Sequence, residues 1–149
     1  MEPLKQWVCD VCGKIIESPK KAYVVWKCVG DDKNHFEYRI IHQGRRDGCD
    51  IDSSYKLSLS IVDFLGDKGV VNLLSLIDVG PFHREEYKLQ IKNIRDFLEF
   101  FRRVQLPYYE EARLYWDNAY NDGFFNGANE LWIYLPSTLE ELIKKYKNN

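Results

Sequence analysis

Cysteine and histidine are the residue types in this chain best suited to bind a metal ion. The four cysteines, Cys9, Cys12, Cys28 and Cys49, all lie in the first third of the 149 residues. Cys9 and Cys12 form the motif C-D-V-C, whose spacing lets both thiolates face one zinc ion. Gly13 then supplies the freedom that a tight turn needs. A redox C-x-x-C would instead follow a strand and begin a helix. No such unit precedes this motif, so the pair favours zinc.

Two predicted strands must position the remaining ligands. Residues 22–29 and 35–42 are rich in β-branched and aromatic side chains, and the second segment alternates between polar and apolar residues. The loop between them, G-D-D-K-N, consists of turn-forming residues. The two segments are therefore predicted to pair as an antiparallel hairpin.

The hairpin divides the candidate ligands into two groups. Cys28 is expected at its tip, opposite Phe36, and His42 at its base, opposite Ala22. Six residues at about 3.3 Å each place these levels roughly 20 Å apart. Zinc–ligand bonds measure only about 2.0–2.3 Å. Cys28 and His42 therefore cannot bind the same ion.

The alternatives are a site at the tip, completed by Cys28 and His35, and a site at the base, completed by His42 and Cys49. The base is favoured because only residues 13–21 separate C-D-V-C from the first strand, and because G-R-R-D-G can turn the chain back before Cys49. Cys28 is then a buried strand residue. Four protein ligands leave no position for water, which is typical of structural zinc. We predict one structural Zn²⁺ bound by Cys9, Cys12, His42 and Cys49.

The motifs C-D-V-C-G-K, I-I-H and D-G-C, together with the hairpin, resemble those of zinc ribbons, a class of β folds stabilised by zinc. The likeness covers about residues 7–50 and implies zinc binding but no particular function. The whole chain is also similar to small bacterial zinc-containing proteins, a likeness that implies no activity.

The remainder of the chain is predicted to be helical because its apolar residues recur at helical spacing. In the amphipathic segment 84–104, Arg103 is expected on the solvent-exposed face. Ser137 and Glu140 form a capping box for a last helix after Pro136. The other predicted helices span residues 55–65, 69–77, 108–121 and, in preference to a strand, 128–135.

These elements define an α+β protein in which a zinc-stapled β-hairpin module packs on a helical bundle. The zinc-ribbon-like module is predicted to cover residues 1–53 and the bundle residues 54–149. No linker rich in Gly, Ser or Pro separates the parts. They are therefore expected to pack as one unit.

Composition limits the possible functions. Hydrophobic residues make up 45% of the chain, which is enough for a core. No apolar run approaches the roughly 20 residues of a membrane span. Glu2 and Pro3 precede the cysteine motif, so we expect no signal peptide and a cytoplasmic location with reduced thiols. The net charge of −2 argues against binding nucleic acid or membrane through bulk charge.

Enzyme motifs are absent from the sequence. It contains no glycine-rich phosphate loop, no G-x-S-x-G and no H-E-x-x-H. The carboxylate pairs Glu85–Glu86 and Glu110–Glu111 are expected to be exposed to solvent, because adjacent helical residues point apart. The chain is therefore predicted not to be an enzyme.

Two features could bind a partner. Nine aromatic residues lie between Tyr108 and Tyr134, where they could form an interface or a helical core. Arg45 and Arg46, beside the predicted ligands, could contact phosphates or a guanine edge. The favoured function is a zinc-stabilised adaptor or inhibitor of another protein, and a nucleic-acid-binding regulator is the alternative. The candidate partner-binding residues are Tyr109, Trp116, Tyr120 and Trp132.

Overall fold

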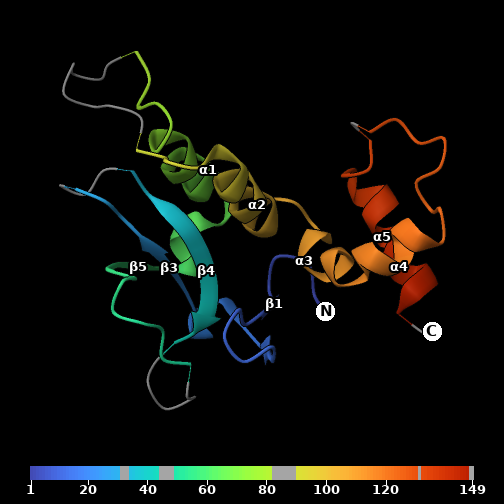
Figure 1. Ribbon diagram of the computed structural model, residues 1–149, viewed down its shortest axis with the longest axis horizontal. Helices are drawn as coiled ribbons and strands as arrows, with labels where there is room; N and C mark the ends of the chain where they lie inside the picture. The colour runs from blue at the N-terminus through green and yellow to red at the C-terminus, as the bar shows by residue number, and fades with distance from the viewer. Residues whose placement is uncertain (31–33, 44–48, 82–89, 131, 148–149) are drawn as a thin grey trace.

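The protein has the predicted α+β fold, with strands in the N-terminal part and mainly helices in the C-terminal part (Figure 1). The structure is a computed structural model that describes residues 1–30, 34–43, 49–81, 90–130 and 132–147. In this described part, no helix combines the length and the apolar character needed to cross a bilayer.

The strands of the described residues form two antiparallel sheets. β1 (Trp7–Val8) pairs with β2 (Ile15–Ile16), and these two strands flank the C-D-V-C turn. β3 (Ala22–Lys27), β4 (Phe36–His42) and β5 (Leu57–Ser60) form a second sheet in the order β4-β3-β5. The larger sheet therefore contains the predicted hairpin and one strand that was not predicted.

The hairpin has the predicted orientation. Ala22 lies opposite His42, as expected at its base. At the tip, Lys27 rather than Cys28 lies opposite Phe36, because an irregularity near the end of β3 shifts the register by one residue. Cys28 follows the strand and is half-buried, whereas a buried position was predicted.

The helix predicted for residues 55–65 is wrong. This segment contains β5 and the 3₁₀ helix η3 (Ile61–Phe64), and β5 pairs with β3 along its whole length. Leu57 and Leu59 alternate with serines, which is the period of a strand. Pairing with the second edge of β3 outweighs the helical spacing of the apolar residues, so the β region extends to Ser60.

Two helices pack together beside the larger sheet. They are α1 (Gly66–Ser75) and α2 (Ile94–Gln105), and α2 contacts both β4 and α1. The Asn93 side chain accepts hydrogen bonds from the backbone N–H groups of Arg95 and Asp96, which fixes the start of α2. The predicted earlier start is wrong for residues 90–93, which are described and are not helical, while residues 84–89 lie outside the described residues.

Three short helices form a second group at the other end of the molecule (Figure 1). They are α3 (Tyr109–Ala112), α4 (Trp116–Asn121) and α5 (Pro136–Tyr146). The single helix predicted for 108–121 is wrong, since a 3₁₀ turn, η4 (Arg113–Tyr115), divides it. The described residues of 128–135 form turns instead of a helix. Ser137 does not cap α5, whose first turn is occupied by Pro136.

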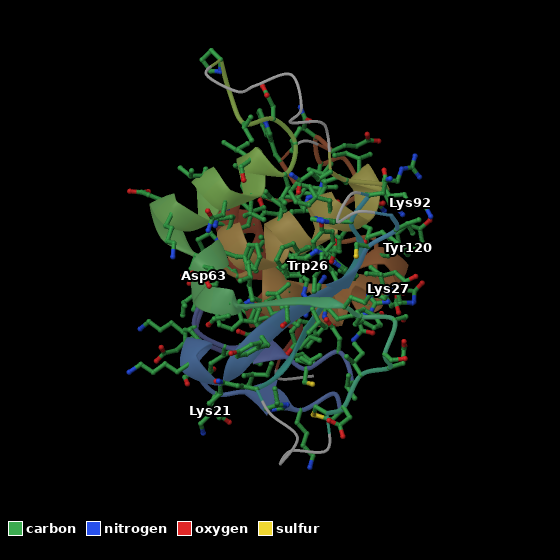
Figure 2. All side chains as sticks on the ribbon, turned by 90° about the vertical axis from the view of Figure 1, so that its left-hand side faces the viewer. Lys21, Trp26, Lys27, Asp63, Lys92 and Tyr120 are labelled. Carbon is green, nitrogen blue, oxygen red and sulfur yellow. The ribbon has the colours of Figure 1, made fainter. Side chains whose placement is uncertain are left out.

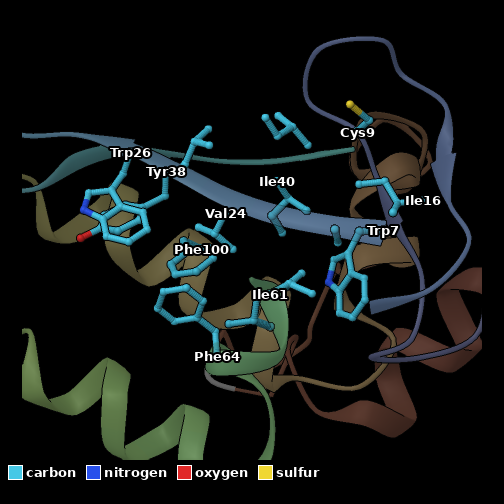
Figure 3. Packing of buried hydrophobic residues seen from close by; sticks show 14 of the residues in the cluster. Trp7, Cys9, Ile16, Val24, Trp26, Tyr38, Ile40, Ile61, Phe64 and Phe100 are labelled. Atoms are coloured by element: carbon cyan, nitrogen blue, oxygen red, sulfur yellow. The ribbon is translucent and has the colours of Figure 1, made fainter. Parts of the chain in front are cut away.

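The buried residues form two clusters. The larger lies between the β4-β3-β5 sheet and the helices α1 and α2, where the stacked rings of Tyr38 and Phe100 lie 4.9 Å apart (Figure 3). It continues past Trp7 to the buried side chains of Cys9 and Cys49. The smaller cluster belongs to α3, α4 and α5. The cysteines are therefore part of the main core, at the junction of the two sheets.

Candidate metal centre

Cys9, Cys12, His42 and Cys49 meet at the base of the hairpin, as the register argument predicted. Their candidate ligand atoms all lie within 4.8 Å of one another. The Cys9 and Cys49 sulfurs are 3.6 Å apart. The His42 Nδ1 atom lies 3.6 Å from the Cys12 sulfur and 3.4 Å from the Cys49 sulfur. These four residues can hold a metal ion.

Three of the six separations between these ligand atoms match tetrahedral metal coordination. Bonds of about 2.3 Å to sulfur and about 2.0 Å to nitrogen, at tetrahedral angles, place two sulfurs about 3.8 Å apart and a sulfur and a nitrogen about 3.5 Å apart. The measured sulfur–sulfur distance of 3.6 Å and sulfur–nitrogen distances of 3.4 and 3.6 Å agree with this geometry. These three separations are compatible with one metal ion bound among the four side chains.

A tight turn brings Cys9 and Cys12 to the same side. The Cys9 N–H donates to the Lys14 carbonyl oxygen, and the Gly13 N–H donates to the Cys9 carbonyl oxygen, each over 2.9 Å. Gly13 has a φ of +70°, a left-handed conformation that a side chain would disfavour. The glycine after the second cysteine is thus required by the shape of the turn.

Asp10 attaches this turn to β4. Its N–H donates to the Ile40 carbonyl oxygen over 2.9 Å, and its carboxylate accepts the Ile40 N–H over 2.6 Å. Ile40 lies two residues before His42 on the same strand. Because the turn is fixed to β4 at this point, its two cysteines are held at the level of the histidine.

The charges of the thiols favour a bound cation. Burial, together with the neighbouring Cys12 and Cys9 sulfurs, raises the pKa of Cys49 to about 12. A hydrogen bond from the Lys14 backbone lowers the pKa of the exposed Cys12 thiol. Several thiolates cannot share so small a space unless a positive charge lies among them, and a divalent ion supplies that charge.

The site is open to solvent on one side. Cys9 and Cys49 are buried, but Cys12 is exposed and His42 is half-buried. A hollow of about 230 Å³ adjoins these last two residues and is lined by Lys14 and Lys21. Lys21 lies at the end of the molecule that carries the clustered sulfur atoms (Figure 2). A divalent ion with three thiolates would have a net charge of −1, and the hollow beside it contains two lysines and one carboxylate, that of Glu17.

A buried ion-pair network links this site to the helices, and it was not predicted. Arg103 on α2 is only 4% exposed and donates to Asp10 over 2.7 Å, to Glu110 over 2.7 and 2.9 Å, and to the Val8 carbonyl oxygen over 3.3 Å. Glu110 in turn accepts the Val8 N–H over 3.0 Å. The guanidinium thereby joins the metal-binding turn, α2 and α3.

Two expectations are corrected by this network. Arg103 was expected on the exposed face of α2, and Glu110–Glu111 were expected to be solvated, but all three are buried. Burial of these charges is possible because each has a partner of opposite charge within ion-pair distance. The helical spacing could have indicated that Arg103 is buried, since it lies beside the buried Phe100 and Val104 on the inner face of α2.

The other candidate residues are distributed over both ends of the molecule. The tip alternative is not supported, because no metal-binding group in the described residues contains Cys28 or His35. Arg45 and Arg46 lie outside the described residues. Tyr109 is buried in the α3–α5 core, contrary to the expectation that it contacts a partner. Trp116 is half-buried, whereas Tyr120 and Trp132 are exposed.

Comparison with protein-family models, curated proteins and solved structures gave no match. Function must therefore be argued from the geometry of this chain alone.

Proposed function

We propose that this protein is a zinc-stabilised protein-interaction module, an adaptor or inhibitor of another protein rather than an enzyme. The observation that carries the proposal is the cluster of Cys9, Cys12, His42 and Cys49, in which three separations match tetrahedral coordination. Three thiolates and one imidazole suit zinc better than magnesium or calcium, which prefer oxygen ligands. With four protein ligands, the ion has no open position for water or substrate, and its role is structural.

The surface that contacts the partner lies on α4 and the segment before α5. Tyr120 is 81% exposed and Trp132 is 62% exposed. Large aromatic side chains anchor many protein interfaces, because their burial on binding contributes much of the affinity. Free thiols at the metal site require a reducing compartment, so we place the protein in the cytoplasm.

Two measurements test this function. Metal analysis of the purified protein should give one zinc per chain. The zinc-loaded protein, immobilised and exposed to nuclease-treated host lysate, should capture one partner protein in stoichiometric amount. The double variant Tyr120→Ala/Trp132→Ala should lose that partner. Val71→Ala, at a residue of α1 that is 65% exposed, is the matched control and should retain it. Equal capture by all three proteins, or capture of nucleic acid alone without nuclease, would reject the proposal.

A further inference from the structure

A hollow of about 670 Å³ lies beside the end of α4. Its lining residues belong to the end of α4 and to the segment between α4 and α5, and Figure 1 shows these helices at the opposite end of the molecule from the β4-β3-β5 sheet. Aromatic and apolar side chains in its lining come from Tyr120, Phe125 and Ile133, and carboxylates come from Asp122 and Glu130. Among the residues that the structure describes, the lining contains no basic residue.

The sequence around the hollow is acidic over a long stretch. Between Arg113 and Lys144 the chain has five acidic residues and no lysine, arginine or histidine. In the described part of the chain, Asp122 and Glu130 form no ion pair. The cations that do contact rings nearby, Arg102 over Tyr134 and Lys145 over Phe124, lie outside the lining. The hollow therefore presents two unneutralised carboxylates.

Exposed rings accompany these carboxylates. Tyr120 lines the hollow and is 81% exposed. Trp132 is 62% exposed and directly precedes the lining residue Ile133 in the sequence, although it is not itself part of the lining. A ring face attracts a cation, and a guanidinium can stack on it while it donates hydrogen bonds to a carboxylate. An acidic partner would instead meet like charge.

We propose that this hollow binds a basic segment of the partner protein, with an arginine placed between the exposed rings and the Asp122 and Glu130 carboxylates. This inference rests on the proposed function and specifies the chemistry of the partner. Arginine fits better than lysine because its planar group can stack and form paired hydrogen bonds at once.

Fluorescence anisotropy with the zinc-loaded full chain tests the inference. The probe is a short labelled peptide of arginine and glycine, and the reference peptide has every arginine replaced by glutamine. The arginine peptide should bind and the reference should not. Asp122→Asn/Glu130→Gln should weaken binding about tenfold, since two exposed ion pairs together contribute about 1.4 kcal/mol.

The matched control is Glu140→Gln/Glu141→Gln. It removes two negative charges from the same stretch without basic residues, but these glutamates belong to α5 and lie outside the lining. It should bind the arginine peptide as the wild type does. Circular dichroism should show that both double variants are folded. Equal weakening in the two variants, equal affinity for the two peptides, or no binding of the arginine peptide at low salt would overturn the inference.

The partner captured from lysate separates this inference from the proposed function. Capture that needs Tyr120 and Trp132 but survives Asp122→Asn/Glu130→Gln would keep the interaction module and overturn the basic segment. Self-association of the purified chain through this surface, seen by sedimentation and abolished by Asp122→Asn/Glu130→Gln, would also overturn it, because a second copy would then be the occupant.

Discussion

The Arg103 guanidinium on α2 and the Asp10 carboxylate in the metal-binding turn form an ion pair of 2.7 Å. Asp10 lies between Cys9 and Cys12, and the same carboxylate oxygen accepts the Ile40 N–H from β4. Arg103 also holds Glu110 on α3. One buried cation thus ties the metal-binding turn to the helices, so the two ends of the molecule do not depend on hydrophobic contact alone.

Replacement of Arg103 is expected to destabilise the protein strongly. Arg103→Met keeps most of the side-chain volume but leaves the buried Glu110 carboxylate without its main partner. Loss of one member of a buried pair costs about 3–5 kcal/mol. Urea unfolding should show this decrease in the free energy of unfolding. Arg95→Met, at an exposed position of the same helix, should change it by less than about 0.5 kcal/mol. Similar effects of the two substitutions would show that the buried network does not stabilise the fold.

The interaction between Arg103 and Asp10 can be measured separately. The Asp10→Asn and Arg103→Met variants, together with the double variant, form a double-mutant cycle. Residues in one buried network are expected to show a coupling energy of about 0.5–3 kcal/mol. Additive effects would mean that the 2.7 Å contact contributes nothing beyond its two separate side chains.

A metal site at the hairpin base and a metal site at its tip lead to opposite predictions for zinc binding by cysteine variants. Cys49→Ser removes a ligand at the hairpin base and should abolish zinc binding and lower solubility, because the energy of metal binding is part of the folding energy. Cys28→Ser should retain one zinc per chain, since Cys28 lies outside the cluster. Metal analysis by mass spectrometry distinguishes the two. Zinc lost from the Cys28 variant and kept in the Cys49 variant would move the site to the tip.

Acid is expected to release the metal. Thiolate and neutral imidazole are the forms that bind zinc, so protons compete with the ion, and its affinity should fall steadily as the pH falls below neutrality. The raised pKa of the Cys49 thiol also lowers the affinity for the metal as the pH falls, because the ion must displace a more tightly held proton. A chelator titration at several pH values measures this. An affinity independent of pH would exclude thiolate ligands.

Short-range patterns predicted the metal site better than they predicted the helices. The C-D-V-C spacing and the alternation of residues 35–42 are local patterns. The hairpin predicted from residues 22–29 and 35–42 has Ala22 opposite His42, as expected. The pairing of β5 with β3 and the burial of Arg103 depend on residues distant in sequence. A single Leu-Ser-Leu-Ser stretch fits a strand or a helix until a neighbouring strand offers hydrogen bonds. An arginine likewise appears solvated until its carboxylate partners are known.

Gly69 offers a test of how closely α1 packs on η3. A glycine-to-alanine change within a helix usually stabilises a protein by about 0.4–1 kcal/mol. At Gly69, however, the added Cβ would lie in severe overlap with the backbone of Phe64, and 2.8 Å from the Gln105 side chain. Gln105 also donates to the Phe64 carbonyl oxygen over 2.6 Å, so it cannot move freely. Gly69→Ala should therefore destabilise the protein by about 1–3 kcal/mol in a thermal unfolding measurement, as overpacking does.

The control is Lys68→Ala, at an exposed neighbouring position, which should have almost no effect in the same measurement. A gain in stability for Gly69→Ala would show that α1 and η3 lie farther apart than described.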